Sequence, residues 1–172
     1  SLIILPTIGS LFLLFSKGNN SSTVKYVALF TSFVNFLISI YLWYLFDSST
    51  SNFQFVEERK WLEGFVNYKV GIDGISILFI ILTTFITPLC IISVNNSIRI
   101  RLRDFLIAIL VMESLMIGVF CSLDLVVFYL FFEAGLIPMF FIIGIWGGER
   151  RVYSAFKFFL YTVLGSVLML VA

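Results

Sequence analysis

The chain contains no histidine, and only 12% of its 172 residues are charged. Because histidine is the commonest metal ligand and a frequent haem ligand, its absence argues against the usual zinc, copper and haem sites. No G-x-G-x-x-G or Walker-type loop is present to hold the phosphates of a nucleotide. We therefore expect no metal or cofactor bound through a recognisable motif, and nucleic acid is not an expected partner.

Cysteine is also scarce. Cys90 and Cys121 both lie inside apolar runs. A free cysteine often occupies such a position as a small apolar residue, so we predict no disulfide framework.

What the chain has in excess is apolar surface: 60% of its residues are hydrophobic, and the mean hydropathy is +1.09. Soluble domains are about half apolar and about a quarter charged. A water-facing fold of this length cannot bury so much apolar surface, so the composition predicts a polytopic membrane protein.

Six apolar runs, separated by polar or charged segments, predict an all-α protein with about six transmembrane helices. A helix needs roughly 20 apolar residues to cross the hydrocarbon core, where every backbone group must be bonded internally. Since the first run is short, residue 1 is not Met and the last run has no polar flank, we expect a fragment of a larger membrane protein; the family resemblance described below implies that it is the N-terminal fragment. The runs cover residues 1–15, 24–46, 73–94, 105–122, 125–146 and 152–172.

The segment between the second and third runs, "FQFVEERKWLEGFVNYKVGI" at 53–72, is too polar to span. Alternation in "FQFV" and in "FVNYKV" predicts a short β-hairpin lying on the membrane surface. An interfacial amphipathic helix is the alternative. The chain then divides into helices at 1–52, the hairpin at 53–72 and helices at 73–172.

The basic residues predict the orientation. If the runs alternate across the bilayer, the loops at 16–23, 95–104 and 147–151 share one side, and positive charge marks the cytoplasmic or matrix side. That side carries Lys17, Lys25, Arg99, Arg101, Arg103, Arg150 and Arg151, whereas the other carries Arg59, Lys60 and Lys69 among Asp47, Glu57, Glu58 and Glu63.

Three ionisable residues, Glu113, Glu133 and Lys157, fall within the predicted spans. Charges at such depth are costly and usually mark ion pathways, relays or buried partners. The fourth and fifth runs are joined only by 122–124, so they must be antiparallel neighbours. Each glutamate lies ten residues from Leu123, about 15 Å from the turn at 1.5 Å per residue, so the two share one depth near the bilayer midplane.

A buried carboxyl group can take up and release protons near neutral pH, which makes Glu113 and Glu133 candidate proton carriers. The alternative is that each is a static hydrogen-bond partner between helices. Pro138 cannot donate to the carbonyl of Ala134, which leaves that acceptor open beside Glu133 or simply kinks the helix. Lys157 either snorkels to the interface or modulates Glu133.

Asp73 opens the third run, where capping of the helix N-terminus is the expected role.

Four segments resemble the antiporter-like membrane subunits of respiratory complex I, the mitochondrial type above all. They are "VGIDGISILFIILTTFITPLCI" (70–91), "VMESLMIGVF" (111–120), "FYLFFEAGLIPMFFIIGIWGGERRVYSAFKFFLYT" (128–162) and "GSVLMLVA" (165–172). Subunits of multisubunit sodium/proton antiporters share motifs similar to "FFE".

The resemblance implies a fold of about fourteen transmembrane helices with two inverted repeats, the first formed by the fourth to eighth helices. It implies proton movement driven by distant quinone reduction, with no redox cofactor in this subunit. Glu133 matches the family's fifth-helix glutamate, a principal ionisable residue of the first repeat, and Glu113 matches the glutamate of the fourth helix. The family's lysines on the seventh and eighth helices, and the charged residue on the twelfth, have no counterpart here.

The implied partners are neighbouring antiporter-like and other membrane-arm subunits of complex I, the lipid bilayer and a possible second chain carrying the rest of the subunit. The implied location is the mitochondrial inner membrane with the basic loops in the matrix, or else a bacterial plasma membrane. A structural membrane scaffold and a subunit of a cation/proton antiporter are the alternative functions.

Overall fold

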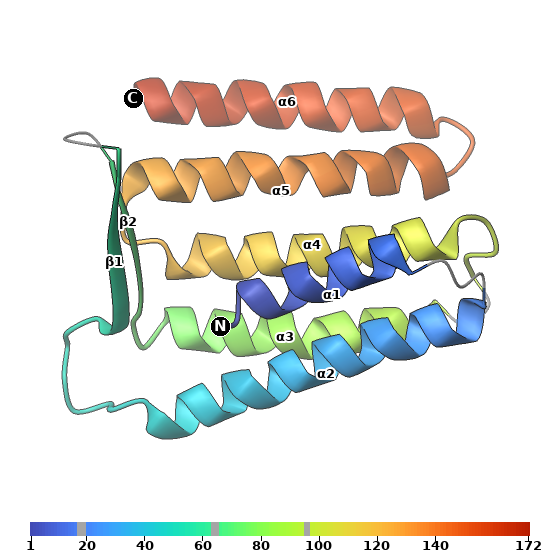
Figure 1. Ribbon diagram of the computed structural model, residues 1–172. Helices are drawn as coiled ribbons and strands as arrows, with labels where there is room; N and C mark the ends of the chain where they lie inside the picture. Colours follow the sequence, from blue (N-terminus) through green and yellow to red (C-terminus); the bar gives the residue numbers. More distant parts are fainter. Residues whose placement is uncertain (17–19, 63–65, 95–96) are drawn as a thin grey trace.

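The computed structural model describes residues 1–16, 20–62, 66–94 and 97–172, which form six helices and one β-hairpin (Figure 1). Within these described residues, five helices are long and apolar enough to cross a membrane, whereas α1 has only 12 residues. The expected helical membrane fold with a hairpin between its second and third helices is confirmed. The elements are α1 (Ile4–Phe15), α2 (Ser21–Leu45), β1 (Gln54–Leu62), β2 (Val66–Ile72), α3 (Ser76–Ser93), α4 (Leu102–Cys121), α5 (Leu125–Trp146) and α6 (Arg151–Val171).

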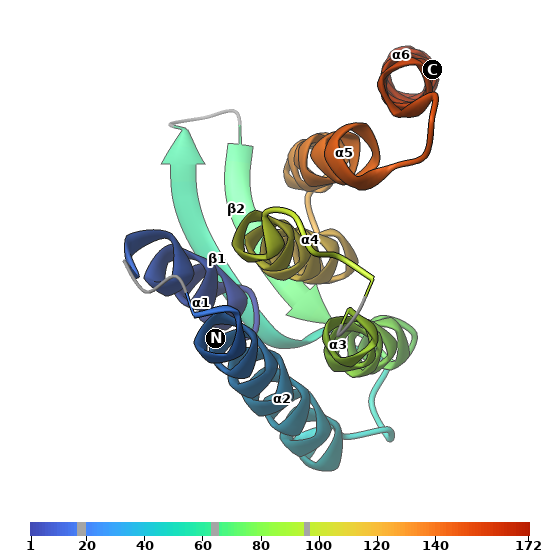
Figure 2. The ribbon, with the colours of Figure 1, turned by 90° about the vertical axis from the view of Figure 1, so that its right-hand side faces the viewer.

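Helix α4 is the centre of the bundle. It packs against α1, α2, α3 and α5, whereas α6 packs on α5. The end-on view shows α3, α4, α5 and α6 following one another, with α1 and α2 to one side of α3 and α4 (Figure 2). Side chains of α4 are therefore enclosed, while the outer face of α6 is open.

Aspartates start two of the spanning helices. The Asp73 carboxylate accepts hydrogen bonds from the backbone N–H groups of Ser76 (2.6 Å) and Ile75 (3.2 Å), and these bonds hold the pKa of Asp73 below its usual value. The predicted capping role of Asp73 is confirmed. Asp124 caps the N-terminus of α5, because its carboxylate accepts hydrogen bonds from the N–H groups of Val126 (2.8 Å) and Val127 (3.3 Å).

The hairpin closes one end of the bundle and is fastened to the turn between α4 and α5. Its strands are antiparallel, and the N–H of Leu123 donates to the carbonyl of Lys69 at 3.0 Å. Val70 also forms an isolated bridge with Ser122, and Val70 is buried together with Ile72. Residues 54–62 and 66–72 are thus strands rather than the alternative interfacial helix.

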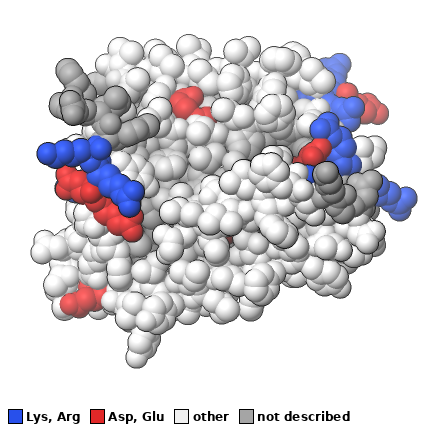
Figure 3. All heavy atoms as spheres, in the orientation of Figure 1, with Lys and Arg blue, Asp and Glu red and all other residues white. Residues whose placement is uncertain are grey.

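The charged residues gather at the two ends of the bundle. Figure 3 shows Lys, Arg, Asp and Glu atoms mainly at these ends, with a largely uncharged band between them. The connections from α1 to α2, from α3 to α4 and from α5 to α6 lie at one end, and the hairpin lies at the other (Figure 1). The alternation of the runs is therefore as predicted. Lys17 and Glu63, which entered the charge comparison, lie outside the described residues.

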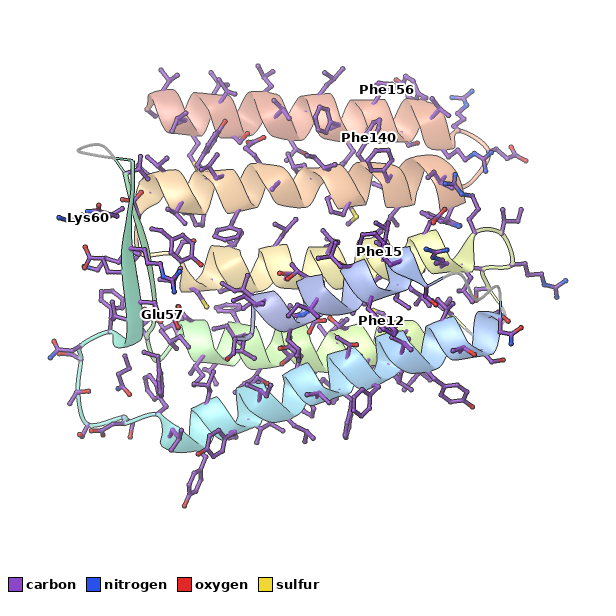
Figure 4. All side chains as sticks on the ribbon, in the orientation of Figure 1. Phe12, Phe15, Glu57, Lys60, Phe140 and Phe156 are labelled. Carbon is purple, nitrogen blue, oxygen red and sulfur yellow. The ribbon has the colours of Figure 1, made fainter. Side chains whose placement is uncertain are left out.

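Close contacts set the spacing of α4, α5 and α6. Phe131 of α5 lies so near Gly118 of α4 that a Cβ atom there would be 2.6 Å from the ring. Between α5 and α6, Phe140 meets Phe156 edge to face, with ring centroids 5.3 Å apart (Figure 4). Phe140 also meets Phe159 edge to face, with ring centroids 5.4 Å apart. Helix α5 is therefore held on both sides.

Candidate functional site

Glu113 lies inside the bundle and is joined to Asn35 of α2. The Asn35 Nδ2 group donates a hydrogen bond of 2.9 Å to Oε1 of Glu113. Asn35 is 0% exposed and Glu113 is 2% exposed. Among the described residues, the other oxygens of this pair, Glu113 Oε2 and Asn35 Oδ1, have no hydrogen-bond partner.

The sequence of α2 places Asn35 on this inner face. Ser32, Asn35 and Ser39 recur at spacings of three and four residues, which puts them on one side of a helix, and all three are buried. Ser39 shares a hydrogen bond of 2.8 Å with Thr84 of α3. Polar side chains of a spanning helix turn toward other helices because lipid cannot bond them.

Glu133 lies on α5 and is half-buried. Its Oε1 accepts a hydrogen bond from the hydroxyl of Ser166, a buried residue of α6. The same hydroxyl lies 2.9 Å from the carbonyl oxygen of Val163. Because a hydroxyl can accept as well as donate, Ser166 is a suitable partner for both the ionised and the neutral forms of Glu133.

The two glutamates share a depth but not a partner. Glu113 lies eight residues before Cys121, where α4 ends, and Glu133 lies eight residues after Leu125, where α5 begins. Each is thus about 12 Å along its helix from the connecting turn, which confirms the predicted equal depth. Their bonds, however, go to α2 and to α6, and α5 lies between α4 and α6 (Figure 2). No hydrogen bond joins Glu113 to Glu133 among the described residues.

Lys157 lies on α6 away from both carboxyl groups. Its side chain is exposed, and Nζ stands 5.8 Å from the ring centroid of Tyr153, a distance that permits a cation–π interaction. Lys157 precedes Ser166 by nine residues, about 14 Å along the helix axis. Within the described part of the chain it forms no ion pair with Glu133. Modulation of Glu133 by Lys157 stays a prediction.

Pro138 is buried within an α5 helix that continues from Leu125 to Trp146. It supplies no N–H to the carbonyl of Ala134, as predicted from the sequence. Ala134 lines a cavity of about 550 Å³ between the hairpin, α4 and α5. The other residues lining this cavity are Arg59, Lys60, Tyr68, Leu115, Val127, Leu130 and Phe131. Any effect of Pro138 on Glu133 stays a prediction.

Asn35 and Ser166 are the partners that the sequence reasoning missed. Both lie in apolar runs, where a single amide or hydroxyl has no local motif around it. The periodic Ser32, Asn35 and Ser39 face was the available signal for Asn35. Within the described ranges, no group of three His, Cys, Asp or Glu side chains is placed to hold a metal ion.

Comparison with known proteins connects this geometry to a family. Residues 122–172 match the family model described as the transmembrane region of NADH:quinone oxidoreductases and Mrp antiporters. Subunit M of the NADH-quinone oxidoreductase of Rhodobacter capsulatus is 62% identical over 160 residues, covering 91% of this chain and 31% of that protein. This chain is a homologue of the antiporter-like membrane subunits of respiratory complex I.

Relatives of the mitochondrial type match along nearly the whole chain. Chain 4 of the NADH-ubiquinone oxidoreductase of Arabidopsis thaliana is 49% identical over 173 residues, covering 99% of this chain and 35% of that protein. A chain in the structure of respiratory complex I from Thermus thermophilus with bound NADH superimposes with a TM-score of 0.81 at 29% identity, covering 99% of this chain and 34% of that one.

The resemblance expected from the motif around Glu133 is therefore confirmed. The chain spans about a third of the length of the relatives that it matches.

Proposed function

We propose that this chain forms the first part of a proton-translocating membrane-arm subunit of respiratory complex I. The observation that carries the proposal is the pair of carboxyl groups held at equal depth in adjacent spanning helices. Ionisable groups at such depth are costly to keep and are typical of proton relays. The relatives named above are subunits of NADH-quinone and NADH-ubiquinone oxidoreductases, which supports the same assignment.

In this proposal Glu133 and Glu113 are separate proton-exchange points. Glu133 exchanges its proton beside Ser166, and Glu113 exchanges its proton beside Asn35. Lys157 and Pro138 modulate Glu133 from a distance, by charge and by backbone geometry respectively. The chain carries out no redox chemistry itself. NADH oxidation and quinone reduction elsewhere in the complex supply the energy.

The proposed location is an energy-conserving membrane, the mitochondrial inner membrane or its bacterial equivalent. The end of the bundle with Arg101 and Arg151 faces the matrix or cytoplasm, since positive charge favours that side. The hairpin faces the opposite side. The proposed partners are other membrane-arm subunits, including neighbouring antiporter-like subunits, the lipid bilayer and the portion of the subunit that corresponds to the remaining length of the relatives.

The division of the chain is also a proposal: helices at 1–52, an interfacial hairpin at 53–72, and helices at 73–172 that begin the first antiporter-like repeat. The equal depth of Glu113 and Glu133 in the last of these segments supports it.

The test is the substitution Glu133→Gln in the assembled complex, with NADH oxidation and proton pumping measured in the same vesicles. Glutamine keeps the size and hydrogen-bonding capacity of the side chain but cannot exchange a proton. We expect pumping to fall while the complex remains assembled. Glu149→Gln, in the exposed connection between α5 and α6, is the matched control. Unchanged pumping by the Glu133→Gln complex would leave the scaffold function as the better explanation.

A second candidate is a subunit of a multisubunit cation/proton antiporter, because the matched family model covers Mrp antiporters as well. Flux measurements in proteoliposomes separate the two. Sodium-dependent proton flux without quinone or NADH would favour the antiporter. Proton flux that requires NADH oxidation would favour the complex I subunit.

A further inference from the structure

The Asn35–Glu113 pair has an unbalanced set of hydrogen-bonding groups. One N–H of Asn35 meets Oε1 of Glu113, while Oε2 of Glu113 and Oδ1 of Asn35 are both buried and unpartnered among the described residues. Both of these oxygens are acceptors when Glu113 is ionised. An ionised Glu113 would thus leave two buried acceptors without a donor, which is a costly arrangement.

No cation balances a charge at this position within the described part of the chain: even Lys69 of β2, the strand that packs on α4, lies beside Leu123, ten residues from Glu113. Helices α1 and α3 carry no acidic or basic residue, and α5 carries only Glu133. The basic residue of α2, Lys25, is ten residues from Asn35, about 15 Å along the helix. On α4, Arg103 is also ten residues from Glu113. A buried carboxylate is normally paired with a cation or a metal, and Glu113 is not.

A single proton corrects the imbalance. The neutral carboxylic acid has one O–H donor, and the two unpartnered oxygens belong to the two side chains that the first hydrogen bond already joins. We propose that Glu113 carries a proton on Oε2 in the resting protein and donates it to Oδ1 of Asn35, which completes a two-bond acid–amide ring between α4 and α2. Asn35 is then the positioning residue of Glu113.

The ring has a consequence for proton exchange. When the proton on Oε2 leaves, the N–H bond from Asn35 remains, so the carboxylate keeps its place while it carries a charge. Charge-assisted hydrogen bonds are stronger than neutral ones, so this remaining bond strengthens as Glu113 ionises. The ring itself does not depend on the proposed pumping function, whereas its role in proton transfer rests on that function.

The test is infrared spectroscopy of the resting, fully assembled complex. Substitution Glu113→Gln identifies the C=O stretching band of the protonated Glu113 carboxyl group as the band that it removes. Asn35→Leu keeps a side chain of similar size without the amide, and Asn35→Ser matches the serines already present on the same face of α2. We expect both to shift the Glu113 band to higher wavenumber, because its C=O group loses the N–H donor.

Ser32→Ala is the matched control. Ser32 is buried on the same helix face one turn away, and its hydroxyl donates to the backbone carbonyl of Leu29. Its substitution should leave the Glu113 band in place. If Asn35→Leu prevents assembly, the wavenumber of the Glu113 band in the Asn35→Ser complex is the test. The inference is overturned if Glu113→Gln removes no protonated-carboxyl band, or if that band does not move in the Asn35 variants.

Proton pumping by the Glu113→Gln complex separates this inference from the proposed function. If Glu113→Gln removes the band but pumping stays normal, the proposed pumping role of Glu113 is overturned, whereas the inferred acid–amide ring of the wild-type protein is supported. If the function holds, Asn35→Leu should slow pumping by roughly ten- to a hundredfold, the factor expected from one lost hydrogen bond to a charged group.

Discussion

The contact between Gly118 and Phe131 leads to a quantitative prediction about how α4 and α5 fit together. A Cβ atom at Gly118 would lie 2.6 Å from two atoms of the Phe131 ring and 2.9 Å from a third. The ring would have to retreat by roughly 1 Å to reach ordinary contact distance, and overpacking of this kind costs about 1–3 kcal/mol. We therefore expect Gly118→Ala to be less stable than a glycine-to-alanine substitution at an open position of the same bundle.

Gly135→Ala is the matched control, because a Cβ atom at Gly135 would meet nothing within 4 Å. Alanine favours a helix over glycine by about 1 kcal/mol, and both variants receive this gain. The difference between their free energies of unfolding therefore isolates the contact with Phe131, and we expect it to be about 1–3 kcal/mol. Reversible unfolding of the purified chain in mixed detergent micelles, followed by circular dichroism, measures it.

The double variant Gly118→Ala/Phe131→Leu tests the assigned cause. Removing the ring should recover much of the lost stability, since residues in direct contact give non-additive effects. If Gly118→Ala is as stable as Gly135→Ala, the close approach of the two helices at this point is wrong.

The remaining predictions concern two helix caps and the isolated lysine. Asp73→Asn should destabilise α3 only at pH values where the Asp73 carboxylate is charged. The pKa of Asp73 is lower in the folded protein than in the unfolded chain, so the contribution of its charge to stability is complete above the unfolded-state pKa. That contribution is lost as the pH falls through the folded-state pKa. The stability difference between wild type and Asp73→Asn should thus shrink on acidification, and a pH-independent difference would contradict the capping bonds. Asp124→Ala should cost about 1 kcal/mol in the same unfolding measurement, because Val126 and Val127 lose their acceptor; a neutral effect would contradict this cap. Lys157→Gln should alter the pH profile of proton pumping if its charge modulates Glu133, whereas an identical profile would make Lys157 an interfacial residue only.

Much of the fold follows from short-range patterns. Apolar runs of spanning length predicted the helices, and alternation in 53–72 predicted the hairpin, because both signals are local to the element that they describe. The short link at 122–124 was sufficient to place Glu113 and Glu133 at one depth. Depth along a helix depends only on the number of residues, so counting is enough to obtain it.

Rotation about the helix axes could not be obtained in this way. Glu113 meets Asn35, which is 78 residues away in sequence, and Glu133 meets Ser166, which is 33 residues away. Which face of α4 or α5 turns toward which neighbour depends on packing such as that of Phe131 on Gly118. The shared depth of the two glutamates therefore suggested that they act as a pair, whereas in the structure they form hydrogen bonds with different helices, α2 and α6.

The most direct test of the central claim is the number of protons pumped per NADH oxidised by complexes carrying Glu133→Asp and Glu133→Gln, prepared side by side. Aspartate keeps a group that can exchange a proton, one methylene shorter, while glutamine does not. Proton translocation through Glu133 predicts that the aspartate complex retains a substantial part of the wild-type ratio and that the glutamine complex falls clearly below it. A wild-type ratio in the glutamine complex would contradict the claim.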